Sequence, residues 1–239
     1  MALVFDIETY TWARSEDHKA VLVDEMRDKR LKDKVKARKS AEKKMALSPR
    51  SGQVIVIGLL DTDAVPDEQV KILKVGDDDP LDIKVVAYES ESRLIEAFFE
   101  YIELMFKAGD RLVSFNGKEF DMPFLFTRAL VHDLDGIDSY DLLIHKYNHA
   151  SHLDIRSFLP KGKLTELSYL INELESPEYE DVGEMWERDQ KLVVQHCWDD
   201  LVKTAALYER IKKWIPQKMS SYSIKKVPSG LLEKIPFGD

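Results

Sequence analysis

The sequence has a single cysteine, Cys197, among its 239 residues. One thiol excludes a disulfide framework and a zinc site built from cysteines. No apolar run reaches the roughly 20 residues of a membrane-spanning helix, and no signal-peptide segment follows Met1. We therefore expect a cytoplasmic protein that has no association with membranes.

The sequence also lacks an excess of positive charge, because 35 Lys and Arg stand against 44 Asp and Glu. A net charge of −9 ordinarily counts against nucleic acid as a partner. The charge is uneven, however: residues 27–44 include ten basic and three acidic residues, a net +7 that leaves −16 on the rest. This basic segment predicts either a solvated, salt-bridged helix or an arm that contacts phosphates.

The composition is that of a globular chain, with 44% hydrophobic and 33% charged residues. Apolar runs rich in β-branched residues predict strands, and apolar residues at helical spacing predict helices. We expect strands at 3–7, 54–60, 70–74, 83–88, 111–115 and 153–155, and helices at 92–107, 120–132, 163–174 and 190–214. This alternation indicates an α/β fold around a mixed sheet. We assign one domain to residues 1–214, with a basic helical insertion at about 15–46, and an irregular C-terminal extension to 215–239.

Two carboxylates end the first expected strand. Asp6 and Glu8 are two residues apart, so an extended strand points both to one face and Ile7 to the other. Two anions so close repel each other, and a shared proton or a divalent cation relieves the repulsion. The pair indicates a metal site, although it would equally suit the opening of a surface loop.

A second polar segment, NGKEFD at 116–121, follows another expected strand. Gly117 lets the backbone approach a ligand closely, and the Asn116 amide can donate to a phosphate or sugar oxygen. Asp121 begins the next expected helix, where it is either a cap or a further acid of the site. Asp154 follows the last short strand and suits either an acid that supports the site or a helix cap.

The last helix contributes a third acid. At about 100° per residue, one helix face is apolar, with Asp200 at its flank beside His196, whereas Asp199 points away and should be solvated. The residues of that face are Val193, Val194, Cys197, Leu201, Thr204 and Tyr208. Taken alone, His196 and Asp200 are explained as an i, i+4 pair on the helix surface.

Together, D-x-E at a strand end, N-x3-F-D after a second strand and H-x3-D on a late helix resemble the DEDD superfamily of 3′–5′ exonucleases. The chain is most similar to the stand-alone proteins related to the exonuclease domain of family B DNA polymerases. The resemblance covers residues 2–213 and includes ALSPRSGQVIVIGL, SHLDI and KLTELSYLINEL. It implies a ribonuclease H-like fold and metal-dependent hydrolysis at the 3′ ends of single-stranded DNA or RNA, with DNA favoured and a role in DNA repair.

The resemblance also implies the site. Asp6, Glu8, Asp121 and Asp200 would be the catalytic carboxylates that bind two Mg²⁺ or Mn²⁺ ions, about 3.5–4 Å apart, for in-line attack of water on the terminal phosphodiester. Further candidates for contact with the substrate are Thr9, Tyr10, Asn116 and Phe120, the last by stacking on a base, although aromatic residues at such junctions more often belong to the core.

One residue departs from the family pattern. The polymerase-related subgroup has tyrosine four residues before the last aspartate, whereas this chain has His196. An imidazole can orient or deprotonate the attacking water, or it can replace the phenol as a hydrogen-bonding group, and we favour a catalytic role. The alternatives to an exonuclease are a degenerate nucleic-acid-binding module on the same fold, or a ribonuclease or endonuclease. The resemblance suggests partners in replication or repair but does not identify them.

Overall fold

The computed structural model describes residues 1–12, 16–27, 33–64, 69–77, 85–135, 143–145 and 148–215. The strands are β1 (Ala2–Thr11), β2 (Gly52–Asp61), β3 (Val70–Val75), β4 (Val85–Tyr88), β5 (Arg111–Ser114) and β6 (His152–Asp154). The α-helices are α1 (Glu16–Met26), α2 (Lys34–Ala46), α3 (Glu91–Lys107), α4 (Asp121–Val131), α6 (Leu164–Asn172), α7 (Val182–Arg188) and α8 (Gln190–Ile211). Two short 3₁₀ helices, η2 (Ile155–Phe158) and η3 (Lys212–Trp214), complete the described elements.

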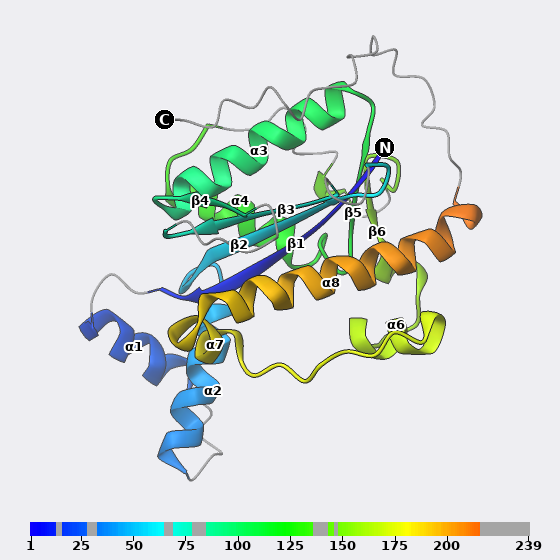
Figure 1. The fold of residues 1–239 in the computed structure, drawn as a ribbon. Coiled ribbons are helices and arrows are strands. Elements are labelled where there is room, and N and C mark those ends of the chain that lie inside the picture. The colour runs from blue at the N-terminus through cyan, green and yellow to red at the C-terminus, as the bar shows by residue number, and fades with distance from the viewer. Residues whose placement is uncertain are drawn as a thin grey trace.

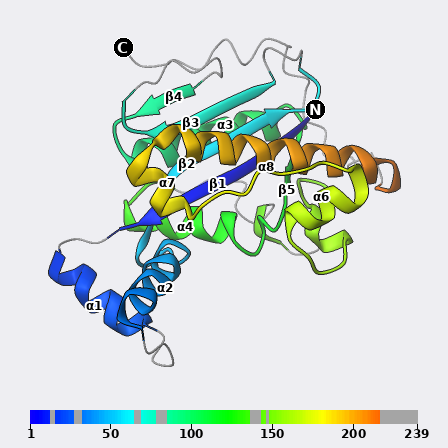
Figure 2. The same cartoon turned by 60° about the horizontal axis from the view of Figure 1, so that its bottom comes forward.

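The strands form one six-stranded mixed sheet in the order β4-β3-β2-β1-β5-β6. β2 runs antiparallel to β1 and to β3, whereas β5 runs parallel to β1 and to β6. Helices α3 and α4 cover one face of the sheet, and α8 crosses the other (Figure 1; Figure 2). The α/β fold with a mixed sheet between helices is therefore confirmed.

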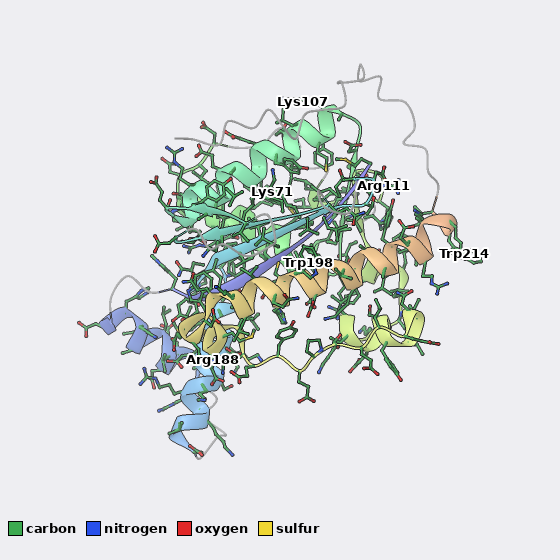
Figure 3. The ribbon with its side chains drawn as sticks, viewed as in Figure 1. Lys71, Lys107, Arg111, Arg188, Trp198 and Trp214 are labelled. Carbon is green, nitrogen blue, oxygen red and sulfur yellow. The ribbon has the colours of Figure 1, made fainter. Side chains whose placement is uncertain are left out.

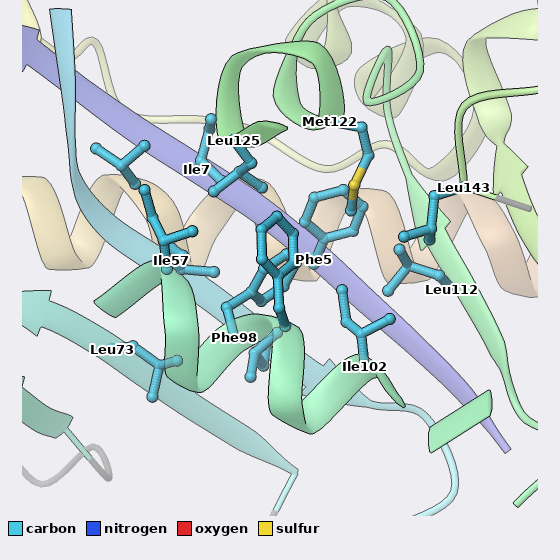
Figure 4. Packing of buried hydrophobic residues seen from close by; sticks show 14 of the residues in the cluster. Phe5, Ile7, Ile57, Leu73, Phe98, Ile102, Leu112, Met122, Leu125 and Leu143 are labelled. Atoms are coloured by element: carbon cyan, nitrogen blue, oxygen red, sulfur yellow. The ribbon is translucent and has the colours of Figure 1, made fainter. Parts of the chain in front are cut away.

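The alternation of side chains along β1 divides the core into two halves. Leu3, Phe5 and Ile7 face α3 and α4, where they join a cluster of buried aliphatic and aromatic residues (Figure 4). Ala2 and Val4 face the opposite side and pack in the cluster beneath α8. Because the alternation continues along the strand, the side chains of residues 6 and 8 are directed to the α8 side.

Strand β1 extends well beyond its neighbour β5. The two strands pair only between Ala2–Val4 and Arg111–Val113, so among the described residues no strand pairs with the β5 side of β1 from residue 5 onward. On its other side β1 pairs with β2 along nearly its whole length, and the register shifts between Glu8 and Thr9. The ends of β5 and β6 and the overhanging half of β1 thus enclose one corner of the sheet.

A glycine lets α8 lie close to the sheet. A Cβ atom on Gly58 of β2 would come within 2.6 Å of Cys197 Sγ and 2.7 Å of Leu201 Cδ1. Real Cβ atoms do not approach other atoms so closely, so only glycine permits this spacing. The apolar face of α8 is buried as its helical phase predicts, with Cys197 and Leu201 both inaccessible to solvent.

The predicted basic insertion contains α1 and α2, which pack against each other and project from the body beyond the end of β1 (Figure 1; Figure 2). Part of its positive charge is paired with acids of the body: Lys39 lies 2.5 Å from Glu184 of α7, and Lys43 lies 3.4 Å from Asp181. The basic insertion is thus in part a salt-bridged helix, which was one of the two structures that the sequence predicted for it. Residues 28–32 lie outside the described residues, and the limits of the domain stay a prediction.

The expected elements correspond to those of the described chain, with two additions. The fourth strand begins at Val85, because residues 81–84 lie outside the described residues, as does the C-terminal extension from 216 onward. The seven-residue α7 and the 3₁₀ helix η2 were not expected, and the helix expected at 190–214 is α8 followed by η3. Within the described residues, no helix combines the length and apolarity needed to cross a membrane.

Candidate active site

Three separate parts of the chain bring acidic residues to the corner beside β1. Asp6 and Glu8 come from the overhanging half of β1, Asp121 from the first residue of α4, and Asp200 from the middle of α8. The charges of the other three acids all act on Asp6 and raise its pKa, after the larger effect of burial. The structure thus brings together the four acids that the sequence predicted.

His196 joins α8 directly to β1. Its Nδ1 lies 2.5 Å from Oε1 of Glu8, which is only 6% exposed. Burial alone would lower the pKa of His196, but the hydrogen bond and charge of Glu8 outweigh it and raise the pKa overall. Burial raises the pKa of Glu8, against the opposing effect of His196. The two groups therefore hold a proton between them, and only Nε2 of His196 is left for a further partner.

Asp121 closes the open edge of β1. Its Oδ1 accepts a hydrogen bond of 3.2 Å from the backbone N–H of Ile7, a group left without a strand partner where β5 ends. Asp121 is 4% exposed, and this burial raises the pKa of its carboxyl group to about 7, even though the hydrogen bond from Ile7 favours the ionised form. Asp121 is thus a member of the site and also satisfies the backbone beside the other acids.

Asp200 has a partner that the sequence analysis missed. Nζ of Lys203, one turn further along α8, lies 2.8 Å from Oδ1 of Asp200. Lys203 is 4% exposed, so its ammonium group is buried among the acids of the site. At about 100° per residue, position 203 lies about 130° from the centre of the apolar face, so the helical phase predicts a solvated lysine and gave no signal of its burial.

The donor set suits a hard divalent cation. One carboxylate oxygen of Asp6, one of Glu8 and Sγ of Cys197 lie within 4.8 Å of one another. Burial keeps the Cys197 thiol protonated by raising its pKa far above its usual value, so the carboxylates are the available ligands. Carboxylate oxygens are the ligands that Mg²⁺ and Mn²⁺ prefer. Buried acids with raised pKa values are also the groups that gain most from a bound cation, so the residues present fit such ions.

A tyrosine that the sequence did not single out packs against His196. The ring centroids of Tyr179 and His196 are 4.7 Å apart, with an angle of 84° between the planes. The Tyr179 hydroxyl donates to Asp199, which also accepts a 3.0 Å hydrogen bond from Nε2 of Gln195. The expectation that Asp199 is solvated was therefore wrong, because the loop before α7 returns over this part of α8 and half-buries it. Trp198, labelled in Figure 3, lies in the same stretch of α8.

Asp154 fixes the loop between β5 and α4. Its two carboxylate oxygens accept hydrogen bonds from the backbone N–H groups of Asn116 at 2.8 Å and Lys118 at 3.1 Å. It also caps η2 through the N–H of Arg156, so the predicted helix cap is present, whereas a supporting role in the site stays a prediction. Asn116 has a φ of 73°, and a Cβ atom on Gly117 would lie 2.4 Å from Oγ of Ser114. The loop is therefore tightly held, and it delivers Asp121 to the site.

The four candidates for substrate contact lie around the acids in different settings. Thr9 is 5% exposed, and the hydroxyl of the half-buried Tyr10 donates to Glu187 of α7 at 2.7 Å. Phe120 is half-buried against the core and lies 5.7 Å, between ring centroids, from Phe124. Asn116 is half-buried at the end of β5. Their contact with a nucleotide stays a prediction.

The protein has a ribonuclease H-like α/β fold, and four acids gather beside the first strand of its sheet. Residues 50–227 match the model of a family described as predicted 3′–5′ exonucleases related to the exonuclease domain of PolB. The match covers more than half of the chain, which therefore belongs to this family. The matched segment includes Asp121, His196 and Asp200, whereas Asp6 and Glu8 precede it and are joined to it by the sheet.

The fold is also that of a solved polymerase structure. The family B DNA polymerase from the hyperthermophilic archaeon Pyrobaculum calidifontis matches 88% of this chain with a TM-score of 0.55 and 13% sequence identity. The match covers 24% of the polymerase chain, so the likeness concerns one part of that enzyme. No curated protein matches this chain.

Proposed function

We propose that this protein is a metal-dependent 3′–5′ exonuclease that acts on single-stranded nucleic acid, with DNA preferred over RNA. The observation that carries the proposal is the meeting of Asp6, Glu8, Asp121 and Asp200 at one buried corner, in a chain of this exonuclease family. Four carboxylates at one place repel one another strongly unless cations compensate them. Action in the cytoplasm and a role in DNA repair stay predictions.

The four acids would hold two Mg²⁺ or Mn²⁺ ions, which supply an activated water and stabilise the leaving 3′ oxygen. Three of the four acids are held in a defined orientation before any ligand arrives. Glu8 is bonded to His196, Asp121 to the N–H of Ile7, and Asp200 to Lys203. Pre-orientation of this kind lowers the reorganisation that binding and catalysis require.

Within this proposal His196 either orients the attacking water or deprotonates it. Its Nδ1 is bonded to Glu8, and its ring packs against Tyr179, so the ring is fixed and only Nε2 can meet water or phosphate. We assign His196 a role in orienting the reacting groups at the position where the family pattern has tyrosine. This assignment does not require the ring to lose its proton, in agreement with the raised pKa.

A degradation assay on 5′-labelled oligonucleotides tests the proposed function. We expect a ladder of shortened products from single-stranded DNA with Mg²⁺ or Mn²⁺, and less product from matched RNA and duplexes. Asp6→Ala and Asp200→Ala should each abolish the ladder without unfolding the protein. Glu209→Ala is the matched control, because this half-exposed acid lies on the same helix and pairs with Lys212.

The same assay separates the alternatives. Cleavage that releases internal fragments first would indicate an endonuclease, and faster loss of RNA would indicate a ribonuclease. Binding of the oligonucleotide without degradation, and without thermal stabilisation by either ion, would indicate a degenerate binding module. Full activity in both acid variants would show that the site is misassigned.

A further inference from the structure

The buried lysine of α8 has a role that the proposed set of metal ligands does not explain. Lys203 is 4% exposed, and its Nζ lies 2.8 Å from Oδ1 of Asp200, three residues earlier on the helix. Burial of an ammonium group is unfavourable unless an anion pairs with it, and the exposed side of α8 offers water to a lysine without this cost. The position therefore places a positive charge inside the acidic corner, paired with Asp200.

The charge of Lys203 extends beyond its direct partner. It lowers the pKa of Asp6 and of Glu8, against the larger effect of their burial. Lys203 therefore stabilises the ionised forms of acids on β1 while it is bonded to an acid on α8. In the metal-free protein Lys203 therefore compensates part of the negative charge that a bound cation would compensate.

Charge counting shows what this fixed cation does to metal binding. With the proton that His196 and Glu8 hold between them counted, the four acids, His196 and Lys203 together carry two negative charges. One divalent cation neutralises this charge, and a second would make the site positive. A phosphodiester carries one negative charge and would offset part of that positive charge, so the second cation binds best when nucleic acid is present.

We propose that Lys203 is a positioning residue of the metal centre, which holds Oδ1 of Asp200 and weakens the binding of the second divalent cation in the absence of nucleic acid. The inference rests on the proposed function, because it needs the four acids to be metal ligands. It concerns a residue of this chain that acts on those ligands and makes no contact with the reacting atoms.

The role of Lys203 predicts two effects of opposite sign. Lys203→Met removes the charge at similar length, frees Oδ1 of Asp200 and should strengthen binding of the second Mn²⁺ by about tenfold or more. The same substitution should lower kcat at saturating metal, because a fixed positive charge is lost where the phosphate gains negative charge. A lysine with a purely structural role would lower metal affinity and turnover together.

Calorimetric titration of the full chain with Mn²⁺ measures the first effect. The variants are Lys203→Met, Lys203→Arg, which keeps the charge, and Lys212→Met, a control that removes a lysine paired with Glu209 at the far end of α8. Lys203→Arg and Lys212→Met should bind Mn²⁺ within about threefold of the unaltered protein. Thermal unfolding with EDTA should show a lower Tm for Lys203→Met alone, and Mn²⁺ should raise that Tm more than it raises the Tm of the unaltered protein.

The outcomes separate this inference from the proposed function. If the unaltered protein binds Mn²⁺ and Lys203→Met binds it equally or more weakly, the role of Lys203 is wrong and the metal site stands. If the unaltered protein binds no Mn²⁺, both proposals are wrong. If Lys203→Met does not fold, Lys203→Arg decides: a tenfold gain in affinity despite the retained charge would contradict the electrostatic role, and unchanged affinity would support it.

Discussion

Asp121→Asn should make the metal-free protein more stable while it abolishes nuclease activity. The amide oxygen of asparagine can still accept the hydrogen bond from Ile7, so the edge of β1 stays satisfied. Asp121 is 4% exposed, and its negative charge is repelled by the charges of Glu8 and Asp154. The substitution removes this charge. The site loses an acid for metal binding, and the fold loses a source of electrostatic strain.

The size of the effect follows from the pKa of Asp121, which burial raises from 3.8 to about 7. A raised pKa in the folded state means that the folded protein binds the proton more strongly than the unfolded chain does. Stability is therefore lost as the pH rises from about 4 to about 7, at roughly 1.4 kcal/mol per pKa unit. Asparagine avoids this loss, so its advantage should grow from about 0.5 kcal/mol at pH 4 to about 4 kcal/mol at pH 8.

Urea unfolding in EDTA at pH 4, 6 and 8 measures this advantage, and the oligonucleotide assay with Mg²⁺ measures activity. Addition of Mg²⁺ at pH 8 should reduce the difference in stability, because the unaltered protein binds the cations and the variant lacks one ligand. A variant that is less stable than the unaltered protein in EDTA at pH 8 would refute the reasoning. So would an advantage that does not change with pH.

Three further predictions concern the surroundings of the acids. His196→Ala should reduce kcat more than it weakens DNA binding measured with Ca²⁺, and equal losses of both would make His196 a binding residue. Gly58→Ala should push α8 from the sheet, cost about 1–3 kcal/mol in urea unfolding and weaken Mn²⁺ binding, and unchanged Mn²⁺ affinity would contradict the close-packing role. In the α2 arm, the double substitution Lys36→Glu and Lys44→Glu should weaken DNA binding and reduce the slope of log K against log salt by about 1 to 2. The control substitution Lys107→Glu on α3 should change neither. An unchanged slope in the double variant would leave the arm as a solvated helix.

The sequence predicted the elements well where a periodic pattern was present. The alternation along β1 placed Asp6 and Glu8 on one face, and the helical phase of α8 placed Asp200 beside the core, as the structure has them. Both inferences rest on local geometry, which a short segment determines by itself. The acids that belong to such segments could therefore be assigned from the amino-acid pattern alone.

The remaining features depend on contacts between segments far apart in the sequence. No local pattern indicates that Tyr179 returns to His196 and Asp199, or that Lys39 of the basic arm pairs with Glu184 of α7. The register shift after Glu8 depends equally on β2. Lys203 is a stronger case, since both its helical phase and its residue type predict a solvated side chain, and its burial depends on the neighbouring acids.

The long sequence separation of the site residues has a consequence for biosynthesis. The bond between Glu8 and His196 joins residues 188 positions apart, and the bond between Asp121 and Ile7 spans 114. Contacts of such separation form late in folding, because the intervening chain must first be ordered. A ribosome completes β1 long before it completes α8, so a growing chain holds two of the acids without the others. The proposed active site is therefore assembled only after α8 has left the ribosome, so a partly made chain should not degrade nucleic acid.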